Sequence, residues 1–349
     1  MKVRVLNEAA SYVRQFAGST SNTGSLFDGY RRVRINAGDG SVRLECGTFD
    51  QGGNVTMDAE GCFEGFNEIE INIHELSDYL RALPADGDMS TKIDGGFFVV
   101  KCGRATKKFE IHFQKETFRQ APMRSEWIPL YYGFSDDVRL LNRLNVSGDV
   151  TLVSADGYLY YKDGLLLNLL LVLSPGLPTF QVMKKFVPKI LSCNPTHIAV
   201  DPNRVGFKND SMQMFVPLTT SKIPMVSKAL ETILPRISPD PITLSAAELK
   251  GACKIMATEW DETRTLFIFL TGTETGVSMS CGRGGKTSCV IDGHIPQGMD
   301  IGLNYIAAKN IVDIGFGDPV SIGVTSTSDA VCLRRDNLIY LSSLRRNTS

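Results

Sequence analysis

The sequence lacks the long apolar run that a membrane helix requires. Its longest such run, from Leu165 to Leu173, is interrupted by Asn168 and is much shorter than the roughly 20 residues that span a bilayer. The opening residues, MKVRVLNEAASYV, also lack the apolar centre of a secretory signal. We therefore expect a protein that stays in the cytoplasm, where it is made, and that has no membrane partner.

Cysteine pairs and histidine clusters are missing as well. The eight cysteines are scattered, with no C-x-x-C pair, which favours buried, reduced thiols over disulfides or a metal site. The four histidines, at positions 74, 112, 197 and 294, have no metal-ligand spacing. A G-x-S-x-G nucleophile elbow is absent too. These absences predict a protein that uses no metal or other cofactor and is not an enzyme.

One glycine-rich string partly matches a phosphate-binding loop. Residues 280–287 read SCGRGGKT and end in the Gly-Lys-Thr of such loops. The motif needs a glycine where Ser280 stands and a helix after the loop, whereas the next residues alternate like a strand. Without a helix N-terminus the loop loses much of its attraction for phosphate. We therefore interpret this string as a hairpin turn.

Strong net charge is missing, but the basic residues are unevenly placed. The formal net charge is −1, so no strong global attraction to nucleic acid is expected. The predicted helices nevertheless carry basic residues, with few acidic residues facing them at helical spacing. These residues are Arg14, Arg81, Arg139, Arg143, Lys184, Lys185, Lys189, Lys250, Lys254 and Lys309. They are either solvated helix faces or, if the helices share one surface, a positive stripe suited to sequence-independent phosphate contact.

What the sequence does contain is a repeated plan. The stretch from Met299 to Leu344 predicts a short helix (Leu303 to Ile311), a Gly/Pro break, a strand and a hairpin. The same order is predicted for residues 72–113 and 181–216, and the three helices begin about 110 to 120 residues apart. The expected fold class is therefore α+β, with three similar domains over residues 1–120, 121–237 and 238–349.

Local signals complete this plan. Residues 1–6 alternate like a strand, and Asn7 is a suitable N-cap for a helix that ends near Gly18. Strands are predicted at residues 32–36, 41–48 and 55–58. Asp-Gly pairs at residues 156–157 and 163–164 predict tight hairpin turns. Ser245, with Glu248 three residues later, predicts a capping box at the start of a helix.

With these features the chain resembles the bacterial DNA sliding clamp, the beta subunit of DNA polymerase III. The resemblance rests on the three-domain repeat and on local matches. INIHELSDYLRALPADGDMSTKIDGGFFVVKCGRATKKFEI is similar to the second half of the clamp's first domain. IGLNYIAAKNIVDIGFGDPVSI is similar to the family's GFNVSYVLDVLNAL segment, and LIYLSSLRR to its YVVMPMRL end. The order and spacing of these motifs extend over nearly the whole chain.

This resemblance implies a non-enzymatic processivity factor for DNA replication. The family forms a head-to-tail dimeric ring, with helices around the DNA and antiparallel sheets outside. The implied partners are duplex DNA bound without sequence preference, a replicative polymerase, a clamp loader and other proteins that carry short linear motifs. The alternative is a structural or host-interaction protein that keeps the clamp fold without encircling DNA, and such a protein would not need basic helix residues on one surface.

The family binds partner peptides in a pocket between its second and third domains. By resemblance, the TDGHRL hairpin of that pocket falls on KDGLLL, residues 162–167, and a FPDYRRV-like loop falls on KIPMVSKAL, residues 222–230. The candidate pocket residues are Leu144, Lys162, Asp163, Gly164, Leu165, Leu167, Pro224, Val226, Ser328, Ala330, Tyr340, Leu341, Ser343 and Leu344. Leu165 and Leu166 replace a histidine and an arginine of the family, so a different peptide preference is expected.

The resemblance also implies an interface that closes the ring. The candidate residues are Arg104, Lys107, Lys108, Phe109, Ile111, Ile255 and Met256. The first-domain strand is basic, as in the family, but the third-domain strand within GRGGKTSCVIDG lacks the family's acidic residues. We therefore expect closure through strand pairing and through apolar contacts of Phe109 and Ile111 with residues 255 and 256, instead of through charge pairing.

Overall fold

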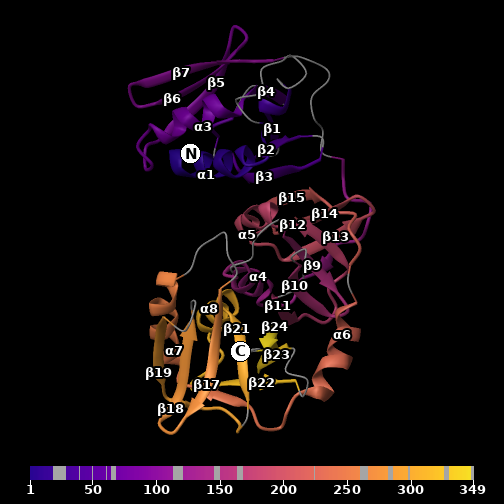
Figure 1. The fold of residues 1–349 in the computed structure, drawn as a ribbon. Helices are drawn as coiled ribbons and strands as arrows, with labels where there is room; N and C mark the ends of the chain where they lie inside the picture. The colour runs from indigo at the N-terminus through magenta and orange to yellow at the C-terminus, as the bar shows by residue number, and fades with distance from the viewer. Residues whose placement is uncertain are drawn as a thin grey trace. The chain divides into compact units, whose positions relative to one another are not determined.

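The predicted repeat is present in the computed structural model of the chain (Figure 1). A strand, a helix and three strands follow one another in three segments, and this order is confirmed. The first segment contains β4 (Glu68–Asn72), α3 (Ile73–Arg81), β5 (Met89–Asp94), β6 (Phe97–Cys102) and β7 (Ala105–Glu110). The second contains β12 (Phe180–Met183), η2 (Lys184–Phe186), α5 (Val187–Cys193), β13 (His197–Asp201), β14 (Arg204–Lys208) and β15 (Met212–Pro217). The third contains β21 (Asp300–Asn304), α8 (Tyr305–Ile314), β22 (Val320–Val324), β23 (Ala330–Arg335) and β24 (Leu338–Arg346).

Each of these segments is preceded by a related one, in which a helix leads into three strands. These are α1 (Val3–Arg14), β1 (Arg32–Gly38), β2 (Ser41–Gly47) and β3 (Gly52–Asp58); then β8 (Ile128–Pro129), α4 (Phe134–Asn142), β9 (Thr151–Ala155), β10 (Tyr158–Lys162) and β11 (Asn168–Leu173); then β16 (Ile242–Leu244), α7 (Ala246–Met256), β17 (Phe267–Thr273), β18 (Gly276–Cys281) and β19 (Thr287–Ile291). The remaining elements are η1 (Gly29–Arg31), α6 (Val226–Ile233), η3 (Leu234–Arg236), η4 (Ala257–Glu259) and β20 (Gly293–His294).

The structure describes residues 1–18, 29–38, 40–48, 50–59, 61–63, 68–112, 121–144, 150–162, 168–223, 225–259, 266–281, 286–297, 299–325 and 330–346. The chain divides into two compact units, Met1–Tyr132 with Pro188–Leu218, and Gly133–Val187 with Thr219–Ser349. The boundaries predicted near residues 120 and 237 fall between β7 and β8 and between η3 and β16. The division into three domains stays a prediction.

In the first unit an antiparallel sheet runs in the order β4-β1-β2-β3-β15-β14-β13-β8, beside a separate sheet of β5, β6 and β7. The pairing of β3 with β15 joins distant parts of the chain, with Val55 opposite Met212. Helix α1 packs on β2 and β3 and against α3, and its residues Leu6 and Val13 are fully buried. The core therefore lies between the helices and one face of the sheet.

The second unit repeats this arrangement. Its largest sheet follows the order β12-β9-β10-β11-β24-β21-β17-β18-β19, and β24 also continues through β23 and β22 to β16. The pairing of β11 with β24 is the counterpart of the β3–β15 junction, with Val172 opposite Leu338. Helices α7 and α8 lie side by side, with α7 on β18 and β19 (Figure 1). No described helix is long and apolar enough to cross a membrane.

Several local predictions are confirmed. The tight turn at residues 156–157 has positive φ at Asp156 (54°) and Gly157 (78°), as a type I′ hairpin requires. The turn predicted at residues 163–164 lies outside the described residues. The Ser245 side chain caps α7 by accepting from the Glu248 N–H at 3.4 Å. The reciprocal half of the capping box is not formed, because the Glu248 carboxylate accepts from the Asp292 N–H instead.

Two predicted boundaries are wrong. Residues 3–6 are not a strand but the first turn of α1. Val3, Leu6 and Val13 are buried together, because their helical spacing outweighs the short alternation at the N-terminus. Leu303 is likewise not in a helix: it belongs to β21, and α8 begins at Tyr305. The cap at this boundary is Asn304, whose side chain accepts from the Ile306 N–H at 2.8 Å.

Candidate functional site

Three features of the structure bear on the predicted functions, and the first is the set of basic helix residues. Six of them are exposed at the surface: Arg81, Arg139, Arg143, Lys185, Lys250 and Lys254. Within the described part of the chain, Arg143, Lys250 and Lys254 form no ion pair. Their charges are therefore available to a polyanion.

Two other basic helix residues face acidic partners, and only one of the two pairs has the helical spacing at which few such neighbours were expected. The Arg14 guanidinium lies 2.5 Å from the Asp78 carboxylate, which joins α1 to α3. This contact lowers the pKa of Asp78 from its ordinary value. On α4 the guanidinium of Arg139 lies 2.7 Å from Asp136, one turn earlier. Sequence spacing within one helix could reveal only the second pair, because the first joins residues 64 positions apart.

The lysines of the η2–α5 segment lie over aromatic rings. Lys184 Nζ is 5.1 Å from the ring centre of Tyr161, and Lys185 Nζ is 5.0 Å from that of Phe186. Lys189 Nζ is 5.1 Å from the ring centre of Phe16 and 2.5 Å from Gln51 Oε1. Partial burial lowers the pKa of Lys184 from its ordinary value. The attraction between each ammonium group and the face of the neighbouring aromatic ring therefore helps to hold these lysine side chains in place.

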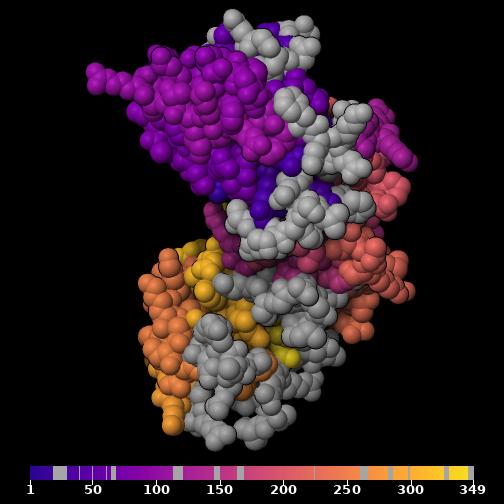
Figure 2. All heavy atoms as spheres, turned by 90° about the horizontal axis from the view of Figure 1, so that it is seen from above, coloured from indigo at the N-terminus to yellow at the C-terminus, as the bar shows by residue number. Residues whose placement is uncertain are grey.

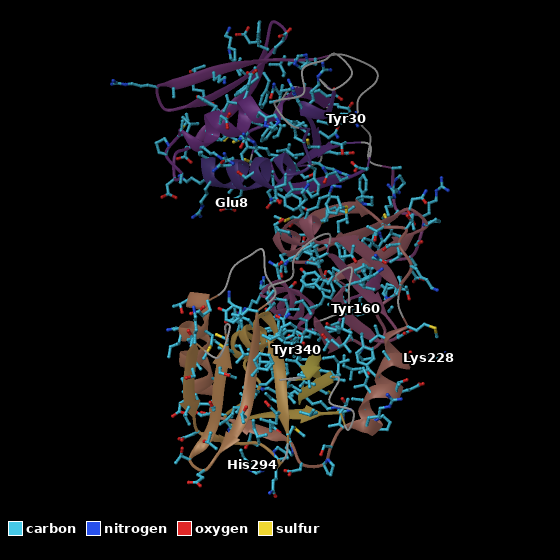
Figure 3. The ribbon with its side chains drawn as sticks, viewed as in Figure 1. Glu8, Tyr30, Tyr160, Lys228, His294 and Tyr340 are labelled. Atoms are coloured by element: carbon cyan, nitrogen blue, oxygen red, sulfur yellow. The ribbon has the colours of Figure 1, made fainter. Side chains whose placement is uncertain are left out.

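The second feature is an apolar core under α6, a helix that the sequence analysis did not predict. Val226 and Leu230 from this helix pack with side chains of β9, β10, β11, β23 and β24. The N-terminal end of α6 is fixed by Asp156, whose carboxylate accepts from the Ser227 hydroxyl at 3.1 Å. Lys228 of α6 and Tyr160 of this core are labelled in Figure 3. The helix was detectable, because Val226, Leu230 and Ile233 have the spacing of one helical face.

The predicted pocket residues fall into three groups. Val226 and Leu341 belong to the core under α6, and Tyr340 is fully buried beside Phe316. Ser343 is exposed, whereas Lys162, Ala330 and Leu344 are partly exposed and Leu144 is buried. Asp163, Gly164, Leu165, Leu167, Pro224 and Ser328 lie outside the described residues. The peptide pocket therefore stays a prediction.

Two exposed apolar side chains near this core were not predicted. Met225, directly before α6, is 67% exposed, and Leu173, at the end of β11, is 48% exposed. Leu173 lies on the same face of the sheet as Leu169 and Leu171, which belong to the core under α6. An exposed apolar residue that continues a buried face is a candidate contact for a partner. The sequence alone predicts that side chains of β11 alternate between the two faces of the sheet. It does not show which of these side chains α6 leaves uncovered.

The third feature is a pair of open strand edges. Among the described strands, β7 pairs only with β6, and β19 pairs only with β18. Strand β7 is basic, with Lys107 and Lys108, whereas residues 287–291 of β19 carry no charge. The surface around residues 89–110 is exposed in the space-filling view (Figure 2, purple). Unpaired edges of this kind are templates for pairing with another chain.

The predicted interface residues differ in how much apolar surface they expose. Phe109 and Ile111 are 1% and 6% exposed, and Met256 is fully buried. These three side chains are already packed within the chain, so Ile255, 48% exposed, has the largest free apolar surface of the predicted set. Val290 of β19, 56% exposed, was not predicted. The residues assigned to the interface stay predictions.

The lysines of β7 already have acidic partners in the first unit. Lys108 Nζ lies 3.3 Å from the Asp94 carboxylate, and Lys107 Nζ lies 3.9 Å from that of Glu75. Lys107 also lies over the ring of Phe109, at 5.1 Å from its centre. An acidic partner strand is therefore not required to neutralise these two residues.

The glycine-rich string is followed by strand β19, not by a helix. Cys281 and Thr287 face each other across β18 and β19. Residues 282–285 of the string, where the turn is predicted, lie outside the described residues. Among the described residues, no three His, Cys, Asp or Glu side chains form a group that could hold a metal ion. All eight cysteines are free, and burial raises the pKa of the Cys46 and Cys253 thiols to about 12. These thiols are weak nucleophiles at neutral pH.

Comparison with known proteins identifies the fold. Neither a protein-family model nor a curated protein sequence matches the chain. Solved structures do match over almost its full length. The Helicobacter pylori beta clamp in complex with 5-chloroisatin has a TM-score of 0.81 at 13% identity, covering 99% of this chain and 98% of that one. The same clamp bound to a DNA ligase peptide has a TM-score of 0.79 at 13% identity and the same coverage.

A DNA polymerase sliding clamp from Pseudomonas aeruginosa has a TM-score of 0.75 at 14% identity, covering 99% of this chain and 98% of that one. The agreement extends over the helices, the sheets and the repeated order of elements described above. At this level of identity the likeness concerns the fold. The chain is an α+β protein with the fold of the bacterial DNA polymerase sliding clamps.

Proposed function

We propose that this chain is a DNA sliding clamp, a non-enzymatic processivity factor that closes as a ring around duplex DNA and tethers a replicative polymerase. Its fold is that of sliding clamps over 99% of its length. The observation that carries the proposal is how strands pair between successive repeats. Two such pairings form within the chain, and two strand edges that could form a third are left open among the described strands.

These pairings follow the order of the repeat. The helix-led segments end in β3, β11 and β19, and the strand-led segments end in β7, β15 and β24. Within the chain, β3 pairs with β15 and β11 pairs with β24. The strands left over are one of each kind, β7 and β19. Pairing β7 of one copy with β19 of the next would continue the same junction, and a head-to-tail junction of this type gives a ring when the rotation between copies closes.

The helix residues support contact with DNA. Arg143, Lys250 and Lys254 are exposed, unpaired charges of the described chain on α7 and at the end of α4. Contacts of this kind attract phosphate without reading base sequence. A net charge of −1 keeps the overall attraction low, so retention on DNA would depend on the closed ring and not on affinity.

The direct test is retention on a nicked circular DNA, with the protein loaded by a clamp loader or applied at high concentration. Release when the circle is linearised would support topological encirclement. Equal retention on both forms would indicate ordinary electrostatic binding and contradict the proposal. Absence of retention, together with a monomeric protein in sedimentation, would favour a clamp-fold scaffold that does not encircle DNA.

For partner tethering, we propose the surface next to α6 as the peptide site. One solved clamp of this fold is bound to a DNA ligase peptide. Truncation after Tyr340 would be a poor test, because residues 341–346 of β24 pair with β11, β21 and β23. Ser343→Asp alters an exposed predicted pocket residue instead. We expect it to weaken binding of a clamp-binding peptide about tenfold, measured by fluorescence anisotropy, with Lys228→Asp on α6 as the control.

A further inference from the structure

The two internal junctions show which residues would face each other where β7 meets β19. This inference rests on the proposed function, because it concerns the interface that closes the ring. The two junctions pair their strands in different registers, so each predicts a different register for β7 against β19. The charges and the turn geometry of β7 and β19 decide which of the two registers fits.

The strands can be matched through their hairpins. Asp58 of β3 lies opposite Ser41, which follows the β1–β2 turn, and Leu173 of β11 lies opposite Tyr158 in the same way. The corresponding residue after β19 is Asp292, the next residue after Ile291, which pairs with Val277. Positions on β19 can therefore be counted back from Asp292.

The β3–β15 junction is the first template. Met212, the first residue of β15, lies opposite Val55, three residues before Asp58. Applied to β7 and β19, this register would place Ala105 opposite Cys289. It would also bring Lys108 opposite Lys286, which is exposed. Like charges directly opposite each other destabilise a strand pair.

The β11–β24 junction is the second template. Leu338, the first residue of β24, lies opposite Val172, one residue before Leu173. This register would place Ala105 opposite Ile291 and Lys107 opposite Cys289. At one end of the ladder Glu110 then lies opposite Lys286. At the other end Arg104 lies opposite Asp292, so both outer positions hold opposite charges.

The turn geometry selects the same template. A two-residue turn precedes β24, between Arg335 and Leu338, and another precedes β7, between Cys102 and Ala105. Both turns contain a residue with positive φ, Asp336 at 51° and Gly103 at 57°. The turn before β15 also closes around two residues, since the Asn209 N–H donates to Met212 O at 2.9 Å, but residues 209–211 include none with positive φ and the Met212 N–H donates to the Asn209 side chain. The β7 hairpin is thus built like the β24 hairpin.

The charged residues that meet in the second register are available. Glu110, Lys286, Arg104 and Asp292 are exposed. Within the described residues, none of the four forms an ion pair in the single chain. Lys107 and Lys108, in contrast, are already paired with Glu75 and Asp94. Charge complementarity is therefore present at the two ends of the ladder.

From these observations we infer that β7 of one copy pairs with β19 of a second copy of this chain in the β11–β24 register. Glu110–Lys286 and Arg104–Asp292 ion pairs flank a centre in which β19 carries no charge and Lys107 and Lys108 of β7 are paired with Glu75 and Asp94 of their own copy. The Glu110–Lys286 pair has the acid on the first-domain strand and the base on the third-domain strand.

Charge reversal tests the ion pair. Sedimentation equilibrium would compare the wild type with Glu110→Lys, Lys286→Glu and the variant that carries both changes. We expect each single reversal to weaken self-association about fivefold per interface and the double reversal to restore it. Glu274→Lys and Lys228→Glu change equally exposed residues away from both edges and are expected to leave association unchanged. Failure of the double reversal to restore association would overturn the Glu110–Lys286 pair.

Cysteine cross-linking tests the register itself. Cys289 is native and partly exposed. Under oxidation, Lys107→Cys is expected to give a disulfide-linked oligomer through Cys289, and Ala105→Cys is not. The opposite result would support the β3–β15 register and overturn the inference while leaving the ring intact. A Cys289→Ser change in each background controls for other cysteines. A wild-type protein that stays monomeric would instead overturn the proposed ring, and with it the inference.

Discussion

The two segments that lead from one repeat to the next lie on equivalent sheets but are fixed by different forces. In the first unit, residues 121–127 lie along β13 and β14 and are held by polar contacts. The Asp201 carboxylate accepts from the Arg124 and Ser125 N–H groups at 3.1 and 2.9 Å. In the second unit, residues 226–233 form α6, which covers an apolar core.

This difference indicates why a partner site is expected in one unit and not in the other. Polar contacts of defined geometry fix the first segment, and Trp127 fills the space over Gly206. The core under α6 continues into exposed apolar residues, Leu173 and Met225. An apolar surface at the margin of a core can accept a further apolar side chain at little structural cost. The second segment is thus the better candidate for peptide binding.

The largest expected effect is at the core under α6. Leu230→Asp would place a carboxylate at a position that is 4% exposed, and we expect a loss of stability above about 3 kcal/mol. Hydrogen exchange should show lost protection in α6 and β9–β11, with unit 1 unchanged. Ala229→Asp, at the exposed neighbouring position, is the control. Equal protection in both variants would mean that α6 is not held by this core.

A smaller effect is expected at the polar segment. Asp201→Ala would remove the acceptor of two backbone N–H groups and the partner of Arg204, which lies 3.3 Å away. Leaving these donors unsatisfied costs about 2 kcal/mol. We expect residues 121–129 to lose exchange protection while α6 keeps its own. Asp210→Ala, at an exposed aspartate between β14 and β15, should change neither region.

Crowding over Gly206 should have a smaller effect again. A Cβ atom there would lie 2.9 Å from Trp127 Cη2 and 3.0 Å from Met123 Cγ. Gly206→Ala is therefore expected to displace the indole at a cost of about 1 kcal/mol, seen as greater acrylamide quenching of Trp127 fluorescence. At Gly38 a Cβ meets nothing within 4 Å, so Gly38→Ala should leave the quenching unchanged.

The smallest effect is a pH dependence confined to the first unit. Burial would raise the pKa of Asp201, but hydrogen bonds from Ser125, Arg124 and Arg204 hold it below its usual value. A carboxylate with a lowered pKa stabilises the fold above its unfolded pKa of about 3.9, and this stability is lost as the pH falls through the folded value. Exchange protection of residues 121–129 should therefore decline below about pH 4, and Asp201→Asn should abolish that decline.

Much of the local structure could be predicted from the residues themselves. The turn at Asp156-Gly157 and the cap at Ser245 depend on interactions within a few positions. The N-terminal helix was predicted, but its start was placed at Asn7 instead of Val3, because a short alternating pattern competed with helical spacing. The Arg14–Asp78 pair could not be predicted, because it depends on two helices meeting.

The candidate site was predicted unevenly for the same reason. The sequence was enough to locate the basic residues on helices and Lys107 and Lys108 on a strand. It could not show that acidic neighbours in the same unit already neutralise these two lysines. Nor could it show that Phe109 and Met256 are buried in the single chain while Ile255 is exposed. Exposure depends on what packs against a side chain, and those neighbours are distant in sequence.

The sequence by itself determined the repeated order of elements, because helical and strand periodicity, capping and turn chemistry act over short distances. Only the tertiary structure decided which strands pair. Backbone hydrogen bonds between strands are the same for any side chains, so the sequence of β3 does not specify β15 as its neighbour. The two junctions that the chain forms, and the two edges that it leaves open, became visible only once the domains had folded.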